Sequence, residues 1–193
     1  MPEKNLEGMR VAILATDGVE NAELKQPREA LNSAGAHTIL FAPKAGEIYS
    51  MNHHDKADRY KVDGTLDEAD PEEFDAVLLP GGALNADALR VHPRAQQFVR
   101  AMDEAGKPIA IICHAPWLLV SAELVRGRTL TSYHTIQDDI RNAGAKWQDH
   151  EVVHDKNWVS SRQPSDIPAF NRAMIELFAE HRRTAADRTR KVA

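Results

Sequence analysis

The chain has 193 residues, a formal net charge of −5 and a pI near 6.0. This length suits one domain with an adequate core, and the acidic balance argues against a general nucleic-acid-binding protein. The single cysteine excludes an intramolecular disulfide, and residues 1–7 are polar, with no apolar signal core and no stretch of membrane-spanning length after them. We therefore expect a soluble protein of the reducing cytoplasm.

Apolar runs typical of buried strands alternate with segments of helical periodicity along the chain. In chain order we predict a strand over 9–15, a helix over 22–34, a strand over 37–42, short or edge strands within 49–61, a turn of helix over 71–74, a strand over 75–80, a helical segment over 86–105 broken near 92–93, and a strand over 109–112. The first three form a strand–helix–strand unit, so their two strands should be parallel with a right-handed crossover.

The second half of the chain continues this alternation with shorter pieces. We predict a helix after residue 114, short strands over 128–131, 146–147, 151–154 and 158–160, a helix over 135–142, and a last helix that Ser165 or Asp166 caps and that runs to about residue 181. The pattern predicts an α/β three-layer sandwich with a mostly parallel sheet and helices on both faces. We expect one domain over 1–181 and a basic, disordered tail over 182–193.

The sole cysteine, Cys113, lies where the apolar run 109–112 stops and the next helix begins, with Pro116 in the first helical turn. A sharp strand-to-helix turn lifts a side chain out of the backbone, as in a nucleophile elbow. The N-terminus of the helix is expected to favour the thiolate over the thiol. The alternative interpretation is a small buried hydrophobe at the end of a strand.

In parallel sheets the functional site lies beyond the carboxyl ends of the strands, where three loops should converge on Cys113. Glu20 ends the first of these loops and could hydrogen-bond the sulfur or carry a proton, or it could be an acidic residue favoured at the start of a helix. His114 could act as a base, although neighbouring side chains of such a turn usually diverge. The backbone N–H groups of Gly82 and His114 are candidates for an oxyanion hole.

The chain resembles the ThiJ/PfpI superfamily, and within it the PfpI-type intracellular proteases, from residue 9 to the final helix. The matching pattern consists of Glu20, Leu79-Pro-Gly-Gly82, Ile111-Ile-Cys-His-Ala-Pro116, Arg126-Gly-Arg128, Thr131-Ser-Tyr133, Asp138-Asp139 and Asn157-Trp-Val-Ser-Ser-Arg162. The resemblance implies a flavodoxin-like sandwich, a Cys113 nucleophile, Glu20 hydrogen-bonded to the sulfur, and an oxyanion hole formed by the Gly82 and His114 amides. It also implies an acid from a neighbouring subunit that orients His114. Asp87 is the best match for that acid.

Members of this superfamily are described as cysteine peptidases, as deglycases or glyoxalases acting on methylglyoxal or its adducts, and as chaperones. We expect a stress-response cysteine hydrolase, active as a peptidase or on small carbonyl adducts, that needs no cofactor and forms at least a homodimer. A redox sensor in which Cys113 is oxidised, or a holdase chaperone, is the alternative. Nucleic acid and membrane are not expected partners.

Three other classes fit the sequence less well. A class I glutamine amidotransferase expects glycines around its cysteine and a late His-x-Glu, whereas Ile112 and His114 flank Cys113. A thioredoxin-like role lacks its second cysteine. The histidines at 53–54, 150 and 154 are better explained as surface residues than as metal ligands, so we predict no metal site.

Overall fold

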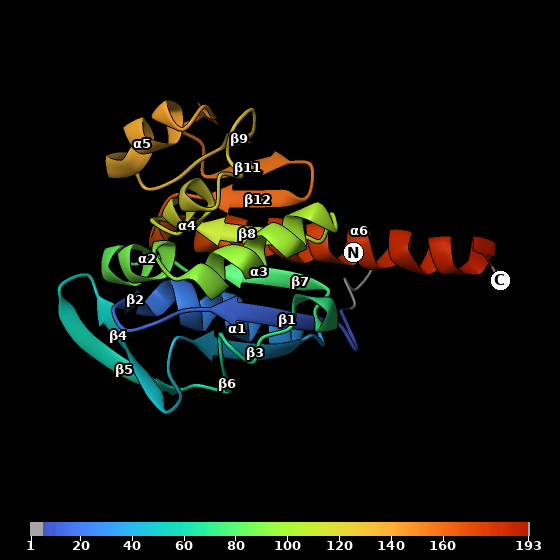
Figure 1. Ribbon diagram of the computed structural model, residues 1–193, viewed down its shortest axis with the longest axis horizontal. Coiled ribbons are helices and arrows are strands. Elements are labelled where there is room, and N and C mark those ends of the chain that lie inside the picture. Colours follow the sequence, from blue (N-terminus) through green and yellow to red (C-terminus); the bar gives the residue numbers. More distant parts are fainter. Residues whose placement is uncertain (1–5, 193) are drawn as a thin grey trace.

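A seven-stranded sheet forms the centre of the computed structural model, which describes residues 6–192 and the side chains of residues 6–184 (Figure 1). The strands lie in the order β11-β12-β8-β7-β1-β3-β6, and every pair is parallel except β11–β12. Their bounds are β1 (Arg10–Leu14), β3 (His37–Ala42), β6 (Gly64–Thr65), β7 (Ala76–Leu79), β8 (Ile109–Ile112), β11 (Val152–Asp155) and β12 (Trp158–Ser161). The predicted, mostly parallel sheet is thus confirmed.

Helices cover both faces of this sheet, as Figure 1 shows. The helices are α1 (Asn21–Ser33) and α6 (Ile167–Val192) on one face, and α2 (Ala83–Arg90), α3 (Pro93–Glu104) and α4 (Pro116–Ser121) on the other. Successive residues of a strand point to opposite faces, so Ala110 and Ile112 share one core with Phe170, while Ile111 shares the second core with Phe98. A buried apolar run such as β8 therefore serves both cores at once.

Smaller elements border the sheet. They are β2 (Val19–Glu20) with the hairpin β4 (Glu47–Asn52) and β5 (Asp55–Lys61), the pair β9 (Thr129–Leu130) and β10 (Lys146–Trp147), helix α5 (Gln137–Asn142), and the 3-10 turns η1 (Pro71–Glu73), η2 (His134–Ile136) and η3 (Pro164–Asp166). The hairpin accounts for the edge strands predicted within 49–61. None of the helices in the described part of the chain combines the length and apolarity needed to cross a membrane.

Two helices end where the sequence did not indicate. We expected a disordered tail over 182–193, but α6 continues to Val192 and leads away from the sheet in Figure 1, with residue 193 outside the described part, as are residues 1–5 of the predicted domain. No glycine or proline interrupts the helix after Pro168, so nothing local stops it. The helix predicted after residue 114 is short: α4 ends at Ser121, and Glu123, just beyond it, has a φ of 62°.

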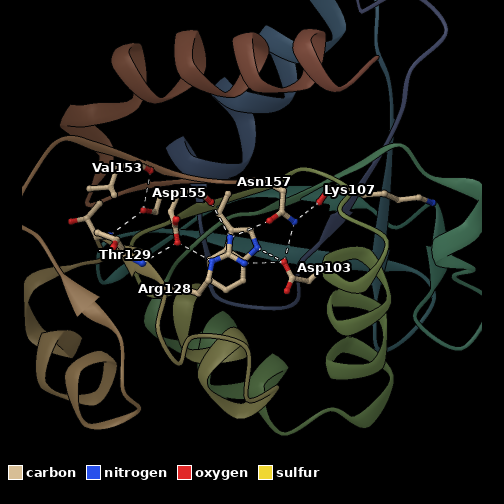
Figure 2. A network of polar contacts seen from close by, with 10 residues as sticks. Asp103, Lys107, Arg128, Thr129, Val153, Asp155 and Asn157 are labelled. Carbon is tan, nitrogen blue, oxygen red and sulfur yellow. Dashed lines mark hydrogen bonds and ion pairs between the residues drawn. The ribbon is translucent and has the colours of Figure 1, made fainter. Parts of the chain in front are cut away.

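A partly buried polar network joins α3 to β9, β11 and β12 (Figure 2). The Arg128 side chain donates to Asp155 Oδ2 at 2.9 Å and to Asp103 Oδ1 at 3.3 Å, and its guanidinium lies 3.7 Å from the Trp158 ring centroid. Asp103 Oδ1 also accepts from Trp158 Nε1 at 2.7 Å and from Asn157 Nδ2 at 3.0 Å. The Arg128 guanidinium, just before β9, thus connects α3 to the end of β11 and to the start of β12.

We expect Arg128→Met to lower the free energy of unfolding by about 3 kcal/mol, because it leaves two carboxylates partly buried without their cation. Denaturant unfolding measures the loss. Arg59→Met is the matched control, since the Arg59–Glu47 pair is largely exposed and should contribute less than about 1 kcal/mol. Equal effects of the two substitutions would contradict a structural role for the network.

Candidate active site

Cys113 occupies the turn between β8 and α4. Its φ is 64°, a backbone conformation that residues other than glycine rarely adopt. Backbone hydrogen bonds fix this turn on both sides. Cys113 N–H donates to Ser161 O at 3.1 Å, and Tyr133 N–H donates to Cys113 O at 2.8 Å. The neighbouring strand β12 and the segment before η2 therefore hold the strained residue in place, as is common at functional sites.

The loop Gly81-Gly82 lies against Cys113 because neither residue carries a side chain. A Cβ at Gly81 would lie 2.5 Å from Cys113 Cβ, and one at Gly82 would lie 2.5 Å from Gly18 O. The φ of Gly82, 92°, also favours glycine. With the loop this close, the backbone N–H groups of Gly82 and His114 act on the Cys113 sulfur and lower the pKa of its thiol. Their role as an oxyanion hole stays a prediction.

The carboxyl group at the sulfur belongs to Glu23 and not to Glu20, which corrects the contact expected from the sequence. Glu23 lies in the first turn of α1, is fully buried, and accepts from Gly81 N–H at 3.0 Å through Oε2. A Cβ at Gly81 would lie 2.3 Å from Glu23 Oε2 and 2.5 Å from Cys113 Cβ, so the carboxyl group adjoins the cysteine side chain, and each group shifts the pKa of the other. Glu20 accepts instead from the backbone N–H of His53 at 3.1 Å, at the tip of the β4–β5 hairpin. The helix begins at Asn21. Glu23, in its first turn, therefore points inward, whereas Glu20, the residue before the helix, does not.

The Cys113–Glu23 pair titrates unlike either group in water. Burial raises the pKa of the Glu23 carboxyl to about 8, so the carboxyl is protonated at neutral pH. Burial and the charge of an ionised Glu23 raise the pKa of the Cys113 thiol, against the opposite effect of the Gly82 and His114 N–H groups. We expected the helix N-terminus to favour the thiolate. That effect is outweighed here, because α4 has only six residues and Cys113 is buried, with 6% of the residue exposed.

His114 does not diverge from the sulfur. Its Nδ1 lies 3.1 Å from Cys113 Sγ, and its Nε2 lies 3.4 Å from Thr135 Oγ1. The ring stacks on Tyr133 with centroids 4.9 Å apart. Burial, and then the nearby His134, lower the pKa of the imidazole, so His114 is a neutral base at neutral pH. A thiol and a neutral imidazole in contact are the parts that a nucleophile and its base require.

Asp87 is separated from this group within one chain. It is exposed on α2, and the partners of the His114 ring nitrogens among the described residues are Cys113 and Thr135. Two large apolar side chains, Leu84 on α2 and Val91 at the C-cap of that helix, are 59% and 73% exposed. They lie seven residues apart, about two helical turns, so they are on the same side of the helix and its cap.

Sequence reasoning missed two residues of the site. Glu23 could have been found from the helix start, since a carboxylate one turn inside a helix that begins at the sheet edge faces the same loops. Asn85 is also fully buried, and its side chain donates to Pro80 O and Gly81 O, both at 3.0 Å, and accepts from Thr16 N–H at 2.7 Å. It fixes the glycine loop to the loop after β1, and no sequence pattern singled it out.

Metal ligands do not gather at this site or elsewhere in the described residues, where no group of three or more His, Cys, Asp or Glu side chains is placed to hold an ion. His53, His54, His150 and His154 are all exposed.

Comparisons with known proteins identify relatives of this chain. The DJ-1/PfpI family model matches residues 9–177. The deglycase PfpI of Pyrococcus furiosus is 40% identical, over 88% of this chain and 99% of its own, and the protein/nucleic acid deglycase 2 of Escherichia coli is 41% identical, over 87% and 96%.

A solved structure from Anabaena variabilis shows the same fold. It contains a DJ-1/ThiJ/PfpI-like domain and a ferritin-like domain, and it superposes with a TM-score of 0.81 at 34% identity over 87% of this chain. The chain spans 47% of that two-domain protein. The match to the family model over most of the chain, together with relatives of about 40% identity over nearly their whole length, shows that this chain belongs to the DJ-1/PfpI family.

Proposed function

We propose that this chain is a cytoplasmic cysteine hydrolase of carbonyl stress, which acts on methylglyoxal and on its adducts with proteins. The observation that carries the proposal is the contact of the Cys113 sulfur with His114 Nδ1 at 3.1 Å, at a turn where Cys113 has a φ of 64°. The names of the relatives, two deglycases, support the same chemistry.

The geometry supports the following sequence of steps. His114 Nδ1 takes the thiol proton as Cys113 sulfur adds to the aldehyde carbon of methylglyoxal, and the resulting oxyanion lies near the Gly82 and His114 N–H groups. Protonation of that oxygen gives a hemithioacetal. A base then removes the proton from the former aldehyde carbon, and a proton returns to the adjacent carbon, which gives a thioester of lactate. Water hydrolyses the thioester to lactate and restores the thiol.

Glu23 is the second proton carrier of this scheme. Its carboxyl is protonated at neutral pH and adjoins the Cys113 side chain, so it can donate a proton to a substrate oxygen or accept one inside the buried site. Cys113 is 6% exposed, which favours a small dicarbonyl compound or a protruding side-chain adduct over an extended peptide. With a protein adduct, Cys113 sulfur displaces the amine or thiol of the protein from the same carbon, and the leaving group takes up the thiol proton through His114. The resulting hemithioacetal then follows the same steps to lactate.

The test is the conversion of methylglyoxal by the purified protein, followed by loss of the dicarbonyl and by enzymatic assay of lactate. We expect methylglyoxal loss and lactate formation to have equal rates, because each methylglyoxal takes up one water and gives one lactate. A peptide substrate panel is run in parallel. Peptide cleavage without lactate formation would assign the site to peptidase chemistry. If the protein showed neither activity, the result would favour a sensor or holdase role.

A second copy of this chain is the partner that we propose for α2. The exposed Leu84 on α2 and Val91 at its C-cap form an apolar stripe, and α2 follows directly after Gly82. Asp87 lies on the same helix between them. Docking of two such helices around a two-fold axis would bury both stripes and present Asp87 to the neighbouring molecule. This supports the assignment of Asp87 as the acid that reaches His114 of the partner.

We expect Asp87→Asn to lower kcat for lactate formation about tenfold while the protein stays dimeric in light scattering, because a carboxylate stabilises the imidazolium better than an amide does. Mixing this variant with inactive Cys113→Ala should restore activity. In a mixed dimer, the intact Cys113 receives Asp87 from its partner. Absence of recovery after verified subunit exchange would show that Asp87 does not act across an interface. A Leu84→Arg variant should be monomeric.

A further inference from the structure

The second ring nitrogen of His114 has a partner within its own chain. Nδ1 faces the sulfur, whereas Nε2 lies 3.4 Å from the hydroxyl oxygen of Thr135. Among the residues that the structure describes, this hydroxyl is the hydrogen-bonding partner of Nε2. A neutral imidazole carries one N–H, and the bond made by one nitrogen decides the protonation of the other.

Backbone contacts fix the position of Thr135. The turn η2, which contains Thr135, follows Tyr133, and Tyr133 N–H donates to Cys113 O at 2.8 Å. Ile136 N–H donates to Tyr133 O at 3.2 Å, and the Ile136 side chain is buried with Leu130 and Ile140. The Thr135 hydroxyl is therefore attached to the same turn that positions the sulfur.

Aromatic side chains restrain the orientation of the imidazole. Tyr133 stacks on one face, with planes 29° apart, and Trp117 approaches edge-on with centroids 5.4 Å apart. Trp117 is itself held by a hydrogen bond from Nε1 to Asp139 Oδ2 at 2.8 Å. With the ring plane restrained, the remaining variable is which nitrogen carries the proton.

We propose that Thr135 is a positioning residue that accepts a hydrogen bond from Nε2–H of His114 and so keeps Nδ1 unprotonated toward the sulfur. The exposed hydroxyl can give its own proton to water. When Nδ1 takes the thiol proton, the imidazolium still donates through Nε2–H, so the contact persists through the step. The catalytic meaning of this inference rests on the proposed function, in which His114 is the base. It implies that a single chain selects the required tautomer before a second copy docks.

Nitrogen-15 NMR of histidine-labelled protein tests the tautomer directly, with the His114 signals assigned by their loss in His114→Gln. We expect a protonated Nε2 and an unprotonated Nδ1 in the wild type at neutral pH. Thr135→Val should shift the averaged signals toward the other tautomer, and Thr135→Ser should restore them. Thr184→Val, which removes a remote exposed hydroxyl of α6, is the matched control and should change nothing. A wild-type spectrum with protonated Nδ1, or one that Thr135→Val leaves unchanged, would overturn the proposal.

Kinetics provide the second readout. At 3.4 Å the hydrogen bond is long, so we expect Thr135→Val to lower kcat about three- to tenfold with little change in KM, and Thr135→Ser to recover most of the loss. Absence of any turnover in the wild type would reject the proposed function, whereas the NMR spectra would still decide the role of Thr135. An unchanged kcat in Thr135→Val, with an active wild type, would reject the positioning role alone.

Discussion

Cys113→Ala is expected to lower lactate formation from methylglyoxal by at least about 10³-fold, because the carbon–sulfur bond is the first covalent step and no other thiol exists in the chain. His114 and Glu23 remain in place in this variant, but they have no nucleophile to activate. Steady-state assays at several methylglyoxal concentrations measure the loss, which should appear in kcat.

Stability measurements show whether that loss is chemical. Alanine retains a Cβ at a φ of 64°, so its thermal unfolding should resemble that of the wild type. Glycine tolerates this conformation, so Cys113→Gly should relieve backbone strain of about 1 kcal/mol and should not be less stable than the alanine variant. Wild-type rates in either folded variant would exclude Cys113 as the nucleophile.

Glu23→Gln is expected to move the pH profile of Cys113 labelling by iodoacetamide to lower pH. In the wild type, an ionised Glu23 opposes the thiolate, and its pKa of about 8 places that charge within the range in which a thiol titrates. The glutamine has no charge, and its amide can donate to sulfur. We expect labelling at pH 8 to be about tenfold faster in this variant. This factor corresponds to about 1.4 kcal/mol less repulsion between the thiolate and residue 23.

Glu20→Gln is the matched control, because the Glu20 carboxylate contacts the His53 amide and not the sulfur. Its labelling profile should stay close to that of the wild type. If the Glu20→Gln profile moved as far as that of Glu23→Gln, the placement of Glu20 at the sulfur, predicted from the sequence, would be right, and the placement of Glu23 there would be wrong. Lactate formation should fall in Glu23→Gln despite the faster labelling, since glutamine cannot carry a proton between substrate atoms.

The same carboxyl links stability to pH. The pKa of Glu23 is raised from 4.5 to about 8 on folding, so the folded state binds the proton more tightly. The contribution of this group to stability is complete below pH 4.5 and is lost as the pH rises toward 8. Relative to Glu23→Gln, the wild type should therefore lose stability across this range. Thermal unfolding of both proteins at pH 5 and 8 tests the sign.

Local sequence patterns determined much of the fold. The apolar runs that became β1, β3, β7 and β8 have buried side chains on both sides, so their hydrophobicity alone marked them as central strands. The break before Pro93 separated α2 from α3, and the edge strands within 49–61 became the β4–β5 hairpin. The end of α6 was not predicted, because a polar, basic composition is compatible with both a solvated helix and a disordered tail.

The sequence by itself determined that Cys113 lies at a strand-to-helix turn with His114 beside it, and that a glycine pair from another loop adjoins it, because these features depend on local patterns and on the order of parallel strands. Only the tertiary structure decided that Glu23 rather than Glu20 meets the sulfur, and that Thr135 meets the far nitrogen of His114. A shift of a few residues along a helix start changes which side chain points inward, and contacts between distant loops depend on packing rather than on local pattern. Burial likewise sets the protonation of the Glu23 carboxyl and is a property of the assembled core.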